Sequence, residues 1–364
     1  LLPAAIDSLP RFVFINGRYC AALSADPALL AGGSLRSPGA GAANAASSIP
    51  AASNDAGAAL AAGSDERFAW INTAFAPDAA QLAVHGELQL ELLFVALPDG
   101  GGGASYPRLQ ISLAPGARLS LVERHLGSGG HGALIAATVE IELAANSQAV
   151  HYRLQSLADD AGFMDTLLAD VGADAEYRVF LLQQGAVSSR SASHLRLTGA
   201  RAQLQVSGMS LAGQQRSLDT AIRVEHLARD ARSDQVLRAI ANDRARIAFN
   251  SRVEVATAAG GADSRQSLKG LIGSSGAEVN LRPQLEINTD EVRASHGATT
   301  GALDESTLFY LLSRGLAPGE ARMLLEWAFM EDVLSRIGIP ALRKQVERAT
   351  VDRLSNAAQL EALL

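Results

Sequence analysis

The chain has 364 residues, a formal net charge of −7, 48% apolar residues and 19% charged residues, which is typical of a large, mildly acidic globular protein. Its 31 Lys and Arg residues form no basic block that could neutralise several phosphates, so nucleic acid is not an expected partner. No apolar run reaches about 18 residues and no signal-peptide pattern opens the chain, so we expect a cytoplasmic protein without a membrane span.

The single cysteine, Cys20, limits the metal chemistry that the chain can support. One thiol cannot form a disulfide within the chain, and a self-contained zinc or iron-sulfur site needs about four ligands, usually thiolates. Any cluster bound here would have to be completed by a partner.

The first 63 residues divide into two segments of different composition. In residues 1–30, the apolar run from Phe12 into the pair Asn16-Gly17 predicts strands joined by a hairpin turn. Residues 31–63 are rich in Ala, Gly and Ser and carry no aromatic residue, so they cannot bury enough apolar surface to offset the entropy of ordering. We expect a flexible loop or linker there.

A β-rich core is expected over residues 64–300. It opens with residues 65 to about 83, where the spacing of Trp70, Ile71, Phe75 and Leu82 predicts a short helix that docks an aromatic face. From Val84 onward, polar and apolar residues alternate, which is typical of strands.

Five of these alternating segments begin alike, with a turn residue and then Ala. They start at Ala117, Ala175, Ala202, Ala245 and Ala277, so the successive starts differ by 58, 27, 43 and 32 residues. Because 58 is close to two periods of 29, we interpret the pattern as an irregular repeat. Stacked repeats bury a continuous core, which favours a parallel β-helix over the alternative of a β-sandwich.

Residues 301–364 change to a helical pattern. Asp304 is a suitable N-cap for a first helix over Glu305 to Ser313, and Gly315 is a suitable stop. Pro318 suits the first turn of a second helix that ends near Gly338. Pro340 suits the first turn of a third helix that runs to about Leu364. The apolar stripe on these helices either packs on the β body or forms a docking surface for another protein. The candidate partner-binding residues are Phe309, Leu312, Met323, Trp327 and Met330.

Several enzyme classes lack their motifs in this chain. There is no phosphate-binding P-loop, no His-x-x-x-His or Cys-x-x-Cys pair, and no Gly-x-Ser-x-Gly. Carboxylates on the alternating segments leave open a carbohydrate lyase or hydrolase built on a β-helix, although residues that alternate with apolar ones normally face solvent. They are Asp219, Glu225, Asp230, Asp234, Asp243, Glu254 and Glu286.

One histidine stands out because small residues flank it where the strand pattern gives way to helices. His296 lies in the run Ala-Ser-His-Gly-Ala-Thr-Thr-Gly, which leaves the imidazole accessible. A neutral imidazole can bind iron or zinc, or it can hydrogen-bond to a turn.

The sequence around His296 resembles the SufB/SufD family, and its SufD branch in particular. The resemblance is carried by Pro-Gln-Leu-Glu-Ile, by Asp-x-Val-x-x-Ser-His-Gly-Ala-Thr, and by Leu-Asp-Glu-x-x-Leu-Phe-Tyr-Leu-x-Ser-Arg-Gly, which ends at Gly315. Val13 to Tyr19 and Arg244 to Asn250 also resemble that family. The similarity extends over about residues 10 to 340.

This resemblance implies a right-handed parallel β-helix with a C-terminal helical domain that acts as a non-enzymatic scaffold subunit in iron-sulfur cluster assembly. It implies pairing with a SufB-like subunit through the β-helices and binding of a SufC-like ABC-type ATPase by helices from about Leu308 to Leu334. It also implies a transient cluster at the SufB-like interface, with His296 as a ligand, and no nucleotide bound by this chain itself. Without a partner, the isolated chain could form a homodimer through the same interface.

Two features depart from the family pattern. Many relatives carry cysteine two residues before the motif histidine, where this chain has Ala294. Relatives usually have a helical region ahead of the first strand, whereas this sequence begins just before that strand, at Leu1 rather than Met. We therefore expect an N-terminal region to be missing from the sequence or from the protein, and we expect His296 or the partner to supply more of the ligands. Besides the scaffold subunit and the carbohydrate enzyme, a third hypothesis is a β-helix without catalytic activity that assembles with its own copies through an uncapped end.

Overall fold

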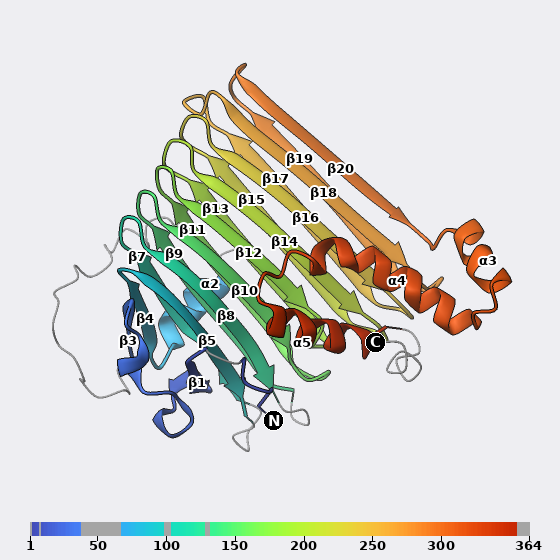
Figure 1. Ribbon diagram of the computed structural model, residues 1–364, viewed down its shortest axis with the longest axis horizontal. Helices are drawn as coiled ribbons and strands as arrows, with labels where there is room; N and C mark the ends of the chain where they lie inside the picture. The colour runs from blue at the N-terminus through green and yellow to red at the C-terminus, as the bar shows by residue number, and fades with distance from the viewer. Residues whose placement is uncertain (1, 7–8, 38–66, 98–102, 128–131, 355–364) are drawn as a thin grey trace.

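The computed structural model describes residues 2–6, 9–37, 67–97, 103–127 and 132–354. Strands dominate and coil into a parallel β-solenoid of about seven turns, followed by helices (Figure 1). The expected parallel β-helix with C-terminal helices is therefore confirmed, and the sandwich alternative is wrong.

The elements alternate between strands of about ten residues and short corners. The strands are β1 (Arg11–Ile15), β2 (Arg18–Tyr19), β3 (Gly33–Arg36), β4 (Ala79–Val84), β5 (Glu87–Ala96), β6 (Ala104–Ser105), β7 (Arg108–Leu113), β8 (Arg118–Gly127), β9 (Leu134–Leu143), β10 (Gln148–Ser156), β11 (Gly162–Val171), β12 (Glu176–Gln183), β13 (Ser188–Leu197), β14 (Gln203–Ala212), β15 (Ser217–His226), β16 (Arg232–Ala241), β17 (Arg246–Val255), β18 (Ala262–Ile272), β19 (Glu278–Ile287) and β20 (Val292–Gly301). The helices are η1 (Ala21–Leu23), η2 (Pro27–Leu29), α2 (Arg67–Phe75), α3 (Glu305–Ser313), α4 (Pro318–Leu334) and α5 (Pro340–Val351).

Each full turn gives one strand to each of two sheets. Sheet A has the order β2-β1-β5-β8-β10-β12-β14-β16-β18-β20, and sheet B has the order β19-β17-β15-β13-β11-β9-β7-β4-β3. Neighbouring long strands are parallel, and Gln203 of β14 pairs with Arg232 of β16, 29 residues further on. The inner faces of both sheets supply the main apolar core.

The alanine-marked repeats lie at the corners of the solenoid. Ala117, Ala175 and Ala202 precede strands of sheet A, whereas Ala245 and Ala277 precede strands of sheet B. The step of 43 residues between Ala202 and Ala245 is therefore one and a half turns, which explains the irregular spacing. At the first three corners the residue before the alanine has positive φ, a backbone conformation that redirects the chain.

Helices cover the outer face of sheet A. Side chains of α4 and α5 pack on apolar residues that point outward from the sheet, including Tyr152 and Phe180. The Gly338 backbone N–H donates to the Tyr152 hydroxyl at 3.0 Å, and Arg238 pairs with Asp332 of α4. The C-terminal helices are thus fixed on the solenoid (Figure 1).

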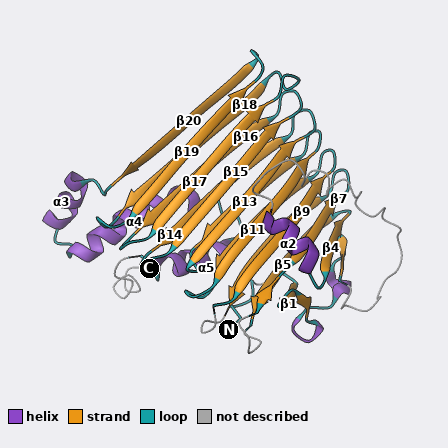
Figure 2. Ribbon diagram, turned by 180° about the vertical axis from the view of Figure 1, so that it is seen from behind, coloured by secondary structure: helices purple, strands orange, loops and turns teal. Residues whose placement is uncertain are grey.

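The predicted helix at residues 65–83 is shorter than expected and docks differently. Helix α2 ends at Phe75 and the chain then forms β4, so the apolar residues before and after Pro77 belong to two different elements. Trp70 is 54% exposed and Phe75 is 64% exposed. The helix is instead anchored on sheet B by buried Asn72, whose side chain donates to backbone oxygens of β9 and its neighbour, Ala136 O and Pro107 O, at 2.7 and 2.8 Å (Figure 2).

The prediction of a flexible loop over residues 31–63 is partly wrong. Gly33–Arg36 forms β3, antiparallel to β4, because glycine permits a close approach: a Cβ on Gly33 would lie 2.3 Å from the Ala83 oxygen. Residues 38–63 lie outside the described part of the chain.

The C-terminal helix starts agree with the sequence. Helix α3 runs from Glu305 to Ser313, capped by the Asp304 side chain, and Gly315 follows with φ +94°. Pro318 and Pro340 begin α4 and α5. Helix α4 ends at Leu334 rather than near Gly338, and α5 ends at Val351 rather than near residue 364; residues 355–364 are not described.

Candidate functional site

The last turn of the solenoid ends in two uncovered edges. Strand β20 closes sheet A and β19 closes sheet B, each is ten residues long, and neither has a further strand beside it among the described residues. At the opposite end the short antiparallel strands β2 and β3 lie against the first turn. A long unpaired strand presents a row of free backbone N–H and C=O groups, which another chain can continue.

The inner face of this last turn is also apolar. Val279, Leu281, Leu285 and Val292 are only partly buried, and Ile287 is 40% exposed. In the middle of the solenoid a further turn covers the equivalent positions. The open end therefore combines free hydrogen-bonding groups with uncovered apolar side chains.

His296 lies in the middle of β20 and is exposed. It pairs in register with Gln266 of β18, so both side chains lie on the inner face of sheet A.

His296 does not belong to a cluster of three or more metal-binding side chains in the part of the chain that is described. No group of three or more His, Cys, Asp or Glu side chains there could hold a metal ion. Cys20 follows β2, at the far edge of sheet A, and the strand order puts it roughly 40 Å from β20 at about 4.8 Å per strand. Any metal ion at His296 would therefore need ligands from outside these residues.

The candidate partner-binding residues divide between surface and core. Phe309 of α3 is 72% exposed and Leu312 is half-buried. Met323 and Met330 are both fully buried, and Trp327 packs partly buried against the same cluster on sheet A. Within this chain the two methionines thus stabilise the attachment of α4 and are not available at its surface.

Helix α3 extends beyond the sheets, and none of its residues is buried. Asp304 caps it by accepting from the Thr307 backbone N–H at 2.7 Å. Hydrogen bonds from Ser306 and Thr307 lower the pKa of Asp304 to about 2, so the cap is ionised at neutral pH. The cap holds the exposed Phe309 and Tyr310 on an ordered helix.

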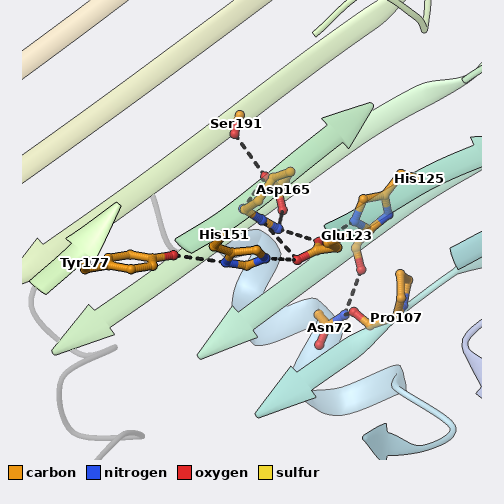
Figure 3. Close-up of polar contacts among 10 residues, drawn as sticks. Asn72, Pro107, Glu123, His125, His151, Asp165, Tyr177 and Ser191 are labelled. Atoms are coloured by element: carbon orange, nitrogen blue, oxygen red, sulfur yellow. Dashed lines mark hydrogen bonds and ion pairs between the residues drawn. The ribbon is translucent and has the colours of Figure 1, made fainter. Parts of the chain in front are cut away.

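Inside the solenoid lies a charged cluster that sequence reasoning missed (Figure 3). The buried Glu123 carboxylate is 2.9 Å from Arg153 Nη2, and it accepts from His125 and His151 at 2.6 and 2.8 Å. Arg153 also contacts Asp165 at 2.9 Å across the interior. The cluster links β8 and β10 of sheet A to β11 of sheet B.

The charges of this cluster stabilise one another. Burial raises the pKa of Glu123, but Arg153 and the hydrogen bonds from His125 and His151 outweigh it and hold that pKa well below its usual value. Burial lowers the pKa of His151, so its ring is neutral, and Nδ1 lies 3.0 Å from the Tyr177 hydroxyl. A cavity beside Arg153 and Asp165 has room for about one water molecule.

The sequence did contain a signal for this cluster. Leu119, Leu121, Glu123 and His125 alternate along β8, so all four share the inner face. The expectation that charged residues in alternating segments face solvent fails here, because Glu123 occupies the same alternate positions as Leu119 and Leu121 and therefore faces inward.

Comparison with known proteins identifies the family. Residues 96–329, more than half of the chain, match the family described as "SUF system FeS cluster assembly, SufBD core domain". The chain belongs to the SufB/SufD family. The resemblance around His296 is thereby confirmed.

Relatives of this SufBD-family chain include SufD proteins. The chain is 28% identical to the iron-sulfur cluster assembly protein SufD of Escherichia coli K12 over 98% of its own length and 82% of that protein. It is 28% identical to the SufBD family protein slr0076 of Synechocystis over 78% of this chain and 65% of that protein. It is also 26% identical to SufD of Plasmodium berghei over 66% of this chain and 18% of that protein. Within its family the chain is most like SufD.

Carboxylates that suggested a carbohydrate enzyme, among them Glu254 and Glu286, lie in ion pairs on the outer surface of this SufBD-family protein. Arg223 is 2.8 Å from Glu254, and Arg252 is 2.5 Å from Glu286. These pairs connect successive turns of sheet B. No helix in the described residues is long and apolar enough to cross a membrane.

Proposed function

We propose that this chain is a non-catalytic scaffold subunit of a SUF-type iron-sulfur cluster assembly complex. Its membership of a family that is described by iron-sulfur cluster assembly supports a role in the SUF system. The observation that carries the scaffold role is the open end of the solenoid, where exposed His296 lies between uncovered strand edges and apolar side chains.

The partner at this open end is a SufB-like subunit. A second β-solenoid could continue both sheets by pairing with β19 and β20, and it would cover Ile287 and Leu285. The nascent cluster is the cargo of this interface. His296 supplies one neutral imidazole ligand and the partner supplies the thiolates, which agrees with the single cysteine of this chain.

The partner at α3 is a SufC-like ATPase. Phe309 and Tyr310 form an exposed aromatic pair on a helix that extends beyond the solenoid, with Leu324 of α4 also exposed at 42%. Aromatic side chains of this kind anchor protein interfaces. Because the sequence carries no P-loop, the partner binds the ATP. The complex works in the cytoplasm.

The test is co-expression with SufB-like and SufC-like subunits, followed by anaerobic purification and measurement of stoichiometry, iron and sulfide. We expect a complex containing all three chains. His296→Ala should leave the complex intact and lower its iron and sulfide content severalfold, whereas His85→Ala, which alters an exposed histidine elsewhere, should leave both unchanged.

The two interfaces are tested separately. Phe309→Ala should release the ATPase and retain the SufB-like subunit, and Phe75→Ala, at an exposed phenylalanine of α2, should release neither. A chain that purifies without partners in every combination would contradict the scaffold role. Cluster content unaffected by His296→Ala would contradict the ligand role.

A further inference from the structure

Buried Gln266 has a side-chain oxygen without a partner beside His296. Gln266 is 2% exposed, and its amide nitrogen Nε2 donates to the Ser251 backbone oxygen at 3.0 Å and to Ser251 Oγ at 2.7 Å. Its oxygen Oε1 is buried and has no hydrogen-bond partner among the described residues.

The orientation of this amide is fixed by its neighbours. A backbone carbonyl can only accept, so the atom facing Ser251 O must be the amide nitrogen. The Ser251 hydroxyl donates its hydrogen to Gln235 Oε1 at 2.6 Å, so it too must accept from Gln266. Oε1 therefore points away from Ser251.

Gln266 has two in-register neighbours on the inner face of sheet A, Gln235 and His296. The amide nitrogen of Gln235 is itself without a partner, so Oε1 of Gln266 is not paired with it. An unpaired buried carbonyl costs about 1–3 kcal/mol. The His296 ring does not donate to Oε1 in this structure, but it lies in register on the adjacent strand, and a turn of the exposed imidazole toward Gln266 would remove that cost.

We propose that Gln266 is a positioning residue for His296: its side-chain oxygen accepts a hydrogen bond from one ring N–H and fixes a single tautomer. The other ring nitrogen then keeps its lone pair available for a metal ion at the open end. This inference rests on the ligand role proposed above for His296. Ligand histidines generally donate their second ring N–H to a carbonyl or carboxylate, which orients the ring and raises its basicity.

The first test measures tautomers in the isolated full chain by NMR of ¹⁵N-labelled histidine, with His296 assigned by the loss of its signals in His296→Ala. In the unsubstituted chain we expect one tautomer to dominate by about tenfold, the effect of a typical hydrogen bond. Gln266→Met, which keeps the shape and removes the acceptor, should give a mixture of both tautomers.

A further variant separates positioning from packing. Gln235→Met removes an equally buried amide one turn further inside and should leave the His296 tautomer unchanged. The signals of buried His151 and His226 report whether each variant is folded. A dominant tautomer that persists in folded Gln266→Met would overturn the proposal.

A second readout connects the tautomer to the cargo. In the assembled complex, Gln266→Met should lower iron content, but by no more than His296→Ala does, because it weakens the ligand histidine without removing it. If His296→Ala retains iron while the tautomer still depends on Gln266, the positioning inference stands and the ligand role of His296 is wrong.

Discussion

At the scale of single residues, the interior of the solenoid tolerates charge only where the charges are paired. Glu123 is fully buried and is held by Arg153, His125 and His151. Glu123→Gln would leave the buried guanidinium with Asp165 alone, so we expect a loss of roughly 3–5 kcal/mol in the free energy of unfolding. Urea denaturation at pH 7 measures it. Glu278→Gln, which breaks an exposed pair with Arg246, should cost less than about 1 kcal/mol; equal losses would contradict the argument.

A second residue-scale prediction concerns acid stability. Burial lowers the pKa of His226 to about 4, although a backbone hydrogen bond at Ala231 and the charge of Asp263 oppose the shift. Between pH 6.5 and 4 the unfolded chain binds a proton at this histidine that the folded chain does not. Stability should therefore fall as the pH decreases through this window, by about 3 kcal/mol for this one group.

The check is a series of urea unfolding curves between pH 7 and 4. His226→Gln keeps a neutral hydrogen-bonding group next to Ser233, which lies 2.8 Å from the His226 ring, and removes the titration. The variant should lose less stability than the unsubstituted chain over the same window. Parallel curves would show that His226 does not titrate as the burial requires.

At the scale of elements, the order of α3 depends on its cap. The helix has no buried residue and is attached through α4, so local interactions decide how often it opens. Asp304→Ala removes three hydrogen bonds at its start and should cost about 1 kcal/mol locally. Hydrogen exchange should accelerate in residues 305–313 and remain unchanged in the strands, and binding of the ATPase should weaken in parallel.

Elements with a strong local signal could be predicted from the sequence, and their packing partners could not. Asp304 as an N-cap and Pro318 as a first helical residue define helix starts through their own chemistry, so both helices begin where expected. The spacing of Met323 and Met330 indicated an apolar stripe but not what covers it, because the outer face of sheet A is built from strands more than 50 residues away in the chain. The pairing of Arg153 with Asp165, across from one sheet to the other, depends likewise on which corner joins which sheet.

At the scale of the whole molecule, the two ends of the solenoid differ. Short antiparallel strands and the first residues of the chain lie against the first turn, whereas β19 and β20 leave the last turn open. An open end that evolved to be covered by a related solenoid should also accept a second copy of itself when the partner is absent. The isolated chain should therefore form a concentration-dependent dimer.

Charge placed on the open end should prevent that dimer. Ile287→Glu puts a carboxylate on an apolar side chain of the last turn that is 40% exposed, where pairing would bury it unpaired. Val187→Glu makes the same change at a corner of the solenoid, at a residue that is 44% exposed and distant from β19. Light scattering should find a monomer for the first variant and a dimer for the second. A SufB-like subunit would cover the same surface, so Ile287→Glu should also reduce binding of that subunit. If the variant lost the dimer but still bound the SufB-like subunit normally, the two contacts would lie on different surfaces.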